Sequence, residues 1–151
     1  MLYRTEGLPI VVIRPFLVYG PGQNNGRFIP QVIKGCISNE EFPVSKGEQL
    51  RDFCYIADFV DAVFLILKNE KTNGNVINIA SGKPVMIKDI INKIVLHVGF
   101  GVPKFDEIKY RKNENMKLYA DITKAHVILG WKPKVNLDTG LKKTINWINK
   151  F

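Results

Sequence analysis

Two arginines stand where a guanidinium group could bind a phosphate. Arg51 opens a short apolar segment, in which a buried charge is costly unless an anion accompanies it. Arg111 lies inside a basic loop. An arginine side chain is always ionised and can bond two phosphate oxygens at once, so both residues are candidate phosphate ligands. The alternatives are an ion pair of Arg51 with Asp52 or Asp58, and a solvated side chain at Arg111.

Arg27 and Phe28 precede and open a predicted helix, because apolar residues recur at helical spacing from Phe28 onward. The free backbone N–H groups of a helix start favour an anion. Arg27 could therefore supply a polar contact and Phe28 an apolar one, with core packing as the alternative for Phe28.

The glycine-rich loop before this helix, at 19–26, joins a strand to a helix. Its spacing is not Gly-x-Gly-x-x-Gly, and no acidic residue ends a following strand about 20 residues later. We therefore do not expect this loop to hold the pyrophosphate of a dinucleotide.

The elements that must position these residues alternate between strands and helices. Strands are predicted at 10–18, 42–44, 51–56 and 75–80, and the first should be buried on both faces because it is almost continuously apolar. Helices are predicted at 28–37, at 59–67 with Asp58 as its cap, at 90–98 ended by Gly99, after Asp121 up to Gly130, and at 137–149. The pattern indicates one α/β domain with a parallel element and a helix-rich C-terminal lobe.

The composition narrows the class of protein. With 151 residues, of which 46% are hydrophobic, the chain can bury a core. A formal net charge of +8 favours an anionic partner, but the lysines are not interleaved with aromatic residues as in a single-strand nucleic-acid groove. No apolar run of about 18 residues could span a membrane, and residues 1–10 lack the pattern of a signal peptide. We expect a cytoplasmic protein that binds neither nucleic acid nor membrane.

The cysteines and histidines do not form a ligand set. Cys36 and Cys54 lie in apolar segments without metal-ligand spacing, which predicts buried, reduced thiols. His97 and His126 each fall within a helical pattern, without a nearby cluster of other ligands, so surface or packing roles are expected for both.

Short motifs follow one another in an order that is specific as a set. They are RPFLVYGPGQ at 14–23, RFIP at 27–30, GEQLRDF at 47–53, YIAD at 55–58, NVINI at 75–79, DITKA at 121–125 and LGWKP at 129–133, with Arg111 ten residues before Asp121. This set resembles the extended short-chain dehydrogenases, the NAD-dependent epimerase/dehydratase family that modifies nucleotide sugars. The resemblance implies a Rossmann-like fold, of which residues 1–151 would be the C-terminal, substrate-binding half as a single domain, with the N-terminal dinucleotide-binding half missing.

The resemblance also implies roles for individual residues. Asn78 would lie near the substrate base, although a structural hydrogen bond is the alternative for an amide in a buried strand. Val44 would line the base pocket, although the turn at 46–47 is one residue shorter than the usual pattern. The implied substrate-binding residues are Arg27, Phe28, Val44, Arg51, Asn78 and Arg111.

The catalytic and cofactor motifs of the family are absent. In the family a Gly-x-x-Gly-x-x-Gly turn holds NAD or NADP, and a Ser/Thr with a Tyr-x-x-x-Lys pair transfers protons during oxidation at sugar C4 and re-reduction or dehydration. None of these is found here; Tyr3 is followed by Gly7 at the lysine position. By resemblance Pro15 and Phe16 approach the nicotinamide end of a cofactor held mainly by the missing half. We expect no catalytic residue in this chain, and neither bound cofactor nor turnover by the chain alone.

Leu17 departs from the family pattern, because many members carry there an asparagine that bonds the substrate phosphate. This substitution leaves an NDP-4-keto-6-deoxysugar reductase as an alternative to an epimerase or dehydratase. Two alternatives belong to other classes of function: a non-catalytic remnant and a basic nucleic-acid-binding module. The expected partners are a nucleotide-diphosphate sugar and either the missing half or another copy, since a chain without its sheet neighbours exposes a strand edge.

Overall fold

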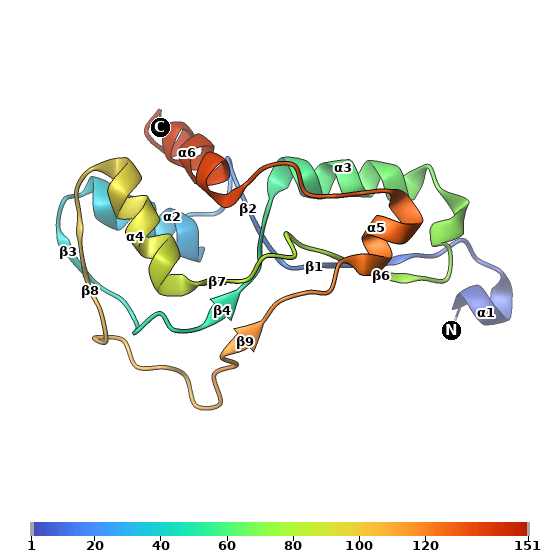
Figure 1. The fold of residues 1–151 in the computed structure, drawn as a ribbon, viewed down its shortest axis with the longest axis horizontal. Helices are drawn as coiled ribbons and strands as arrows, with labels where there is room; N and C mark the ends of the chain where they lie inside the picture. Colours follow the sequence, from blue (N-terminus) through green and yellow to red (C-terminus); the bar gives the residue numbers. More distant parts are fainter. Residues whose placement is uncertain (1, 151) are drawn as a thin grey trace.

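The computed structural model describes residues 2–150, which form short strands and six α-helices in alternation (Figure 1). The helices are α1 Leu2–Glu6, α2 Phe28–Ile37, α3 Ile56–Leu67, α4 Ile87–Val98, α5 Thr123–Leu129 and α6 Leu137–Ile148, with the 3₁₀ turn η1 at Glu70–Thr72. The strands are β1 Val12–Pro15, β2 Leu17–Tyr19, β3 Glu41–Pro43, β4 Leu50–Arg51, β5 Phe53–Tyr55, β6 Val76–Ile79, β7 Val85–Met86, β8 Val102–Lys104 and β9 Lys117–Leu118.

Most strand pairs are parallel. β1 pairs with β6, β2 with β5, β3 with β8 and β4 with β9 in parallel, and only β7 joins β4 antiparallel among the described residues. Parallel strands need long crossover connections, which here contain the helices. The predicted α/β class with a parallel element is therefore confirmed.

The predicted strand at 10–18 is two strands with different partners. Pro15 ends β1 and has no N–H to donate, and after Phe16 the chain continues as β2 beside β5 instead of β6. β1 pairs on one side only among residues 2–150, and Val12 is 48% exposed. The expectation of one continuous strand buried on both faces was wrong.

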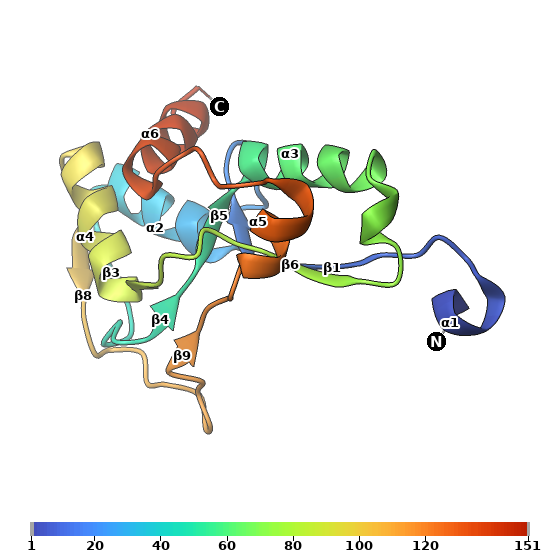
Figure 2. The ribbon, with the colours of Figure 1, turned by 45° about the vertical axis from the view of Figure 1, so that its right-hand side comes forward.

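The molecule has two ends that differ in construction. We call the part with α2, α4 and α6, together with β3 and β8, the three-helix end, and the part with β1, β6, α3 and α5 the sheet end (Figures 1 and 2). α1 lies beyond the sheet end and buries no residue. The strands β2 and β5 lie between the two ends.

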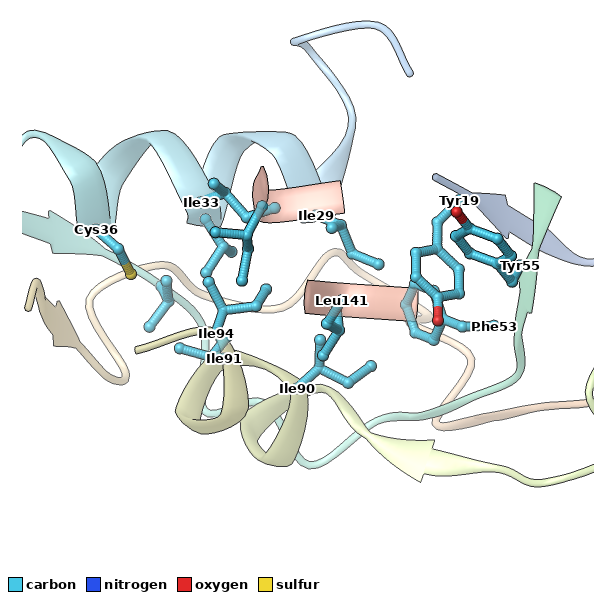
Figure 3. Packing of buried hydrophobic residues seen from close by; sticks show 13 residues of the cluster. Tyr19, Ile29, Ile33, Cys36, Phe53, Tyr55, Ile90, Ile91, Ile94 and Leu141 are labelled. Carbon is cyan, nitrogen blue, oxygen red and sulfur yellow. The ribbon is translucent and has the colours of Figure 1, made fainter. Parts of the chain in front are cut away.

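The main hydrophobic core lies at the three-helix end (Figure 3). Ile29 and Ile33 of α2 face Ile90 and Ile94 of α4, and Leu141 of α6 lies beside them. Apolar residues at helical spacing thus bury one face of each helix, as the sequence predicts.

The ends of the helices follow the predicted residues except at α3. Gly99 and Gly130 adopt φ values of +92° and +64° and end α4 and α5. The Asp121 carboxylate accepts a hydrogen bond from Thr123 N at 2.8 Å and so satisfies a free donor at the start of α5. Asp58, however, is not the cap of α3. It is buried within the first turn, and its two carboxylate oxygens accept hydrogen bonds from the backbone N–H groups of residues 134 and 135, both at 3.0 Å.

α3 leaves much of its apolar surface exposed. Its fully buried residues are Asp58, Ala62 and Ile66. Phe64 and Leu67, which belong to the apolar stripe expected from the sequence, are 57% and 75% exposed. The helix was predicted correctly, but most of its apolar stripe does not face the core of the described chain.

No helix within residues 2–150 is both long and apolar enough to cross a membrane.

Candidate binding site

A cavity of about 630 Å³ opens between the three-helix end and the strands β2, β4 and β5. Its volume falls within the usual range for small-molecule sites. The chain contributes to it from β2, the start of α2, the segment after β3, β4, β5, the start of α4 and the loop at 105–116. Its lining includes Leu17, Gln23, Arg27, Phe28, Gln31, Val44, Gln49, Arg51, Phe53, Ile108, Arg111 and Glu114.

Arg51 and Arg111 are far apart in the sequence but line this same cavity. Arg51 lies on β4, its side chain is only 12% exposed, and its Nη1 donates to the carbonyl oxygen of Leu50 at 2.9 Å. Its Nη2 donates to the carboxylate of Glu114. A guanidinium has five N–H donors, so donors beyond these two bonds remain for an anion in the cavity. Arg51 forms its ion pair with Glu114. The alternative prediction, an ion pair with Asp52 or Asp58, was wrong.

Asp52, next to Arg51 in the sequence, has a structural role. It is fully buried and accepts hydrogen bonds from Ser81 N at 2.8 Å, Ser81 Oγ at 2.5 Å and Gly82 N at 3.0 Å. These bonds fix the turn after β6 against the junction of β4 and β5. The two neighbouring residues therefore have different roles. Arg51 lines the cavity, and Asp52 binds the backbone of the turn.

Arg27, Phe28 and Val44, three further residues for which substrate binding is predicted, also line the cavity. Arg27 is the N-cap residue of α2 and makes no side-chain cap, so the helix begins at the cavity wall without a side chain occupying its first N–H groups. Phe28 packs against Phe53 with ring centroids 6.1 Å apart, and it contacts the main core as well as the cavity.

Three of the predicted residues lie outside the cavity lining. The Nδ2 of Asn78 donates to the carbonyl oxygen of Asp121 at 3.2 Å, which is the structural alternative weighed for this residue. Pro15 and Phe16 follow one another at the end of β1, where Phe16 N donates to Ile79 O at 3.0 Å. The next residue, Leu17, does line the cavity and offers it no hydrogen-bonding group.

The glycine-rich loop at 19–26 is explained by packing. Gly20 has φ +152°, and a Cβ at this position would lie 2.4 Å from Cγ2 of Ile56 at the start of α3. The close approach that requires a glycine is therefore to a side chain of the protein itself. This packing requirement applies to Gly20 and not to Gly22, where φ is +78° and a Cβ would meet no atom within 4 Å.

The cysteines are buried and free, as predicted. Burial raises the pKa of Cys36 to about 11, and burial with the nearby carboxylates of Asp58 and Asp52 raises the pKa of Cys54 to about 12. Both thiols are protonated at neutral pH and are poor nucleophiles.

Three polar residues at the cavity were not identified as site residues from the sequence: Gln23, Gln49 and Glu114. Gln49 could have been inferred from its position two residues before Arg51, because alternate residues of a strand share a face. Glu114 could not, since only the folded loop brings it to Arg51. His97 was expected in a surface or packing role, and its Nε2 lies 2.7 Å from Oδ1 of Asp138, joining α4 to α6.

Solved structures with this fold define the class of the protein. A UDP-glucuronic acid 4-epimerase from Bacillus cereus, in complex with UDP-glucuronic acid and NAD, matches with a TM-score of 0.89 and 31% identity, over 98% of this chain and 48% of the other. A structure of Pal from Bacillus thuringiensis matches with a TM-score of 0.89 and 32% identity, over 99% of this chain and 48% of the other. The fold is thus that of the C-terminal half of the Rossmann-like epimerases.

The sequence comparison identifies the family. The family model for the NAD dependent epimerase/dehydratase family matches residues 2–80. A UDP-N-acetyl-alpha-D-glucosaminuronate decarboxylase of Bacillus cytotoxicus is 32% identical, over 98% of this chain and 49% of the relative. A UDP-glucuronate 4-epimerase of Thermodesulfobacterium geofontis is 35% identical, over 93% of this chain and 43% of the relative. This chain belongs to the NAD-dependent epimerase/dehydratase family, and it spans about half the length of the curated relatives it matches.

Proposed function

We propose that this chain is the nucleotide-sugar-binding half of an NAD(P)-dependent epimerase or dehydratase, and that its cavity binds the nucleoside diphosphate of the substrate. One observation carries the proposal. Two arginines from distant parts of the sequence, Arg51 and Arg111, meet at one cavity beside the uncapped start of α2. Guanidinium groups and helix N-termini are the two common binding elements for phosphate.

The charge balance of the cavity supports an anionic ligand. Arg51 is nearly buried, and in the described chain its charge is balanced by Glu114 alone. A diphosphate brings about two further negative charges, which the remaining donors of Arg51 and the exposed Arg111 can accept. Phe28 and Val44 supply apolar surface of the kind that a nucleobase needs.

The cofactor would meet this chain at a different place. When bound, NAD or NADP would accept the hydride from the sugar and return it, and the related epimerase structure contains NAD together with UDP-glucuronic acid. Pro15 and Phe16 would lie toward the nicotinamide end. The glycine-rich loop of this chain packs against Ile56, and the sequence contains no Tyr-x-x-x-Lys pair. The pyrophosphate cradle and the proton-transferring residues must therefore come from a further segment, in the same polypeptide or another, and residues 1–151 alone should show no turnover.

The surface of the sheet end supports a partner of this kind. β1 has one unpaired edge among residues 2–150, and α3 at the same end of the molecule exposes Phe64 and Leu67. An open parallel edge with an apolar helix surface favours further strands and helices that complete the sheet. A second copy of this chain is the competing occupant.

Calorimetry tests the binding proposal directly. The purified chain is titrated with UDP-, dTDP-, CDP- and GDP-sugars, and at least one of these should bind. Arg51→Met should weaken that binding by tenfold or more, because a charge-assisted hydrogen bond is worth about 1.5–3 kcal/mol, and Arg111→Met should weaken it less, because Arg111 is exposed.

The matched control is Arg4→Met, which removes the same charge from exposed α1 and should leave the affinity unchanged. If no nucleotide sugar binds, or if all three variants weaken binding equally, the proposal is wrong.

A further inference from the structure

Two residues that line the cavity each carry a buried side-chain polar atom with no hydrogen-bond partner among residues 2–150. These atoms are the Oε1 atoms of Gln23 and Gln49. Buried polar atoms in folded proteins are almost always paired. Two orphan acceptors on one cavity wall therefore indicate a ligand that carries hydrogen-bond donors.

The orientation of the Gln23 amide is fixed by a hydrogen bond. Its Nε2 donates to the carbonyl oxygen of Val18 at 2.8 Å, which fixes the orientation of the amide and leaves the carbonyl oxygen unpaired. The orphan group of Gln23 is thus an oxygen that needs a donor.

Gln49 is the more buried of the two, with only 8% of its surface exposed. Its backbone is held in place, because its carbonyl oxygen accepts a hydrogen bond from Ile87 N at 3.0 Å where α4 begins. Gln49 and Arg51 lie two residues apart and both line the cavity, as alternate residues of an extended segment do. Two residues of extended chain span about 7 Å, so the two side chains leave the backbone at neighbouring points beside the cavity.

The diphosphate itself cannot pair with this oxygen, because phosphate oxygens at neutral pH accept hydrogen bonds and do not donate them. The donors of a nucleotide sugar are the hydroxyls of the sugar, the hydroxyls of the ribose and the N–H groups of the base. The positions of the cavity residues along the chain indicate which of these donors lies near Gln49. On one side of Arg51 lies Phe53, which pairs with Leu17 next to the predicted nicotinamide contacts, so the reacting sugar belongs there. Gln49 lies on the opposite side of Arg51, where the nucleoside would then lie.

We propose that Gln49 accepts a hydrogen bond from a ribose hydroxyl, so that the cavity selects ribonucleoside diphosphates over their deoxy forms. This inference rests on the proposed function, because it takes Arg51 as the diphosphate ligand. It adds to that function a substrate class, the ribonucleotide-linked sugars, and a residue that determines it.

The test compares UDP with 2′-deoxy-UDP and 3′-deoxy-UDP by calorimetry on the full chain. For the wild type, one of the two deoxy forms should bind about fivefold more weakly than UDP, which corresponds to the loss of one ordinary hydrogen bond. Gln49→Met keeps the length of the side chain and removes the acceptor, and it should bring that ratio close to one. Gln49→Glu keeps an acceptor oxygen and should keep the ratio, while its charge weakens the binding of all three ligands.

Gln31→Met is the matched control, because Gln31 lines the same cavity but is exposed, and the ratio should stay at its wild-type value. The inference is overturned if the wild type binds all three ligands equally, or if Gln49→Met retains the ratio. A uniform loss for all three ligands in Gln49→Met would overturn it too, since the donor would then lie on the base. If neither UDP nor any nucleotide sugar binds the wild type, the proposed function fails as well, and the two failures are thereby distinguished.

Discussion

The two ends of this molecule differ in how completely each buries its own apolar surface. At the three-helix end, Ile33, Ile90, Ile94 and Leu141 are all fully buried where α2, α4 and α6 meet. At the sheet end, a smaller cluster around Ile77 and Ile79 lies under α3 and α5. There the outer side of α3 and one edge of β1 remain open.

Under the proposed function, this difference separates the part that would bind the nucleotide sugar from the part that would pair with a further segment. The walls of the cavity are built mainly from elements that pack on the main core, so the described chain itself positions the arginines, although Leu96 on α4 is 77% exposed. The sheet end lacks neighbours on one side, in agreement with a chain that spans about half the length of its relatives. Binding should therefore be retained by this chain even where catalysis is not.

The largest expected effect comes from truncating one apolar side chain at each end. Ile94→Ala at the three-helix end should lower the free energy of unfolding by about 2–5 kcal/mol, because it leaves a cavity in a fully buried cluster. Leu67→Ala at the sheet end should change it by no more than about 0.5 kcal/mol, because Leu67 is 75% exposed. Urea denaturation followed by circular dichroism measures both.

Equal losses in these two variants would mean that the exposed side of α3 is covered in solution by another copy. In that case the unfolding midpoint of the wild type would depend on protein concentration. A midpoint independent of concentration, together with a small effect of Leu67→Ala, would support the difference between the two ends.

The next effect concerns the connection between the two ends. Asp58 on α3 accepts hydrogen bonds from two backbone N–H groups of the segment that leads from α5 to α6. Asp58→Ala removes both acceptors from partly buried donors, and should lower the free energy of unfolding by about 2 kcal/mol. The control is Asp61→Ala, which removes only an exposed ion pair with the side chain of Lys134 and should be close to the wild type. If the two variants lose equal stability, Asp58 does not connect the ends.

The sequence predicted most of this architecture because its signals are local. Helical spacing located α2, α4 and α6, and glycine located the ends of α4 and α5. The roles proposed for Arg51 and Arg111 also follow from local motifs. The partners of these residues do not, because Glu114 reaches Arg51 only through the fold of the loop at 105–116, and the orphan oxygen of Gln49 depends on what surrounds it.

The predictions that failed concern burial at the sheet end. An apolar pattern reports which residues avoid water in the complete protein, and it says nothing of which segment covers them. The strand predicted at 10–18 and the stripe on α3 are apolar, yet Val12 and Phe64 are exposed in the described chain. The function of Asp58 was also misjudged, since a carboxylate near a helix start caps that helix by default and here binds a distant segment instead.

The smallest expected effect concerns a charge contact that joins α4 to α6 at the three-helix end. Hydrogen bonds from His97 and Lys142 hold the pKa of Asp138 below its usual value. A carboxyl group with a lowered pKa in the folded state stabilises that state above its unfolded pKa of about 4, and this contribution is lost as the pH falls through the folded value. The wild type should therefore be slightly more stable than Asp138→Asn at pH 6, and the difference should shrink as the pH falls below about 4. Thermal unfolding of both proteins between pH 7 and pH 3 measures this; a difference that persisted undiminished at the lowest pH would mean that Asp138 acts through packing and not through its charge.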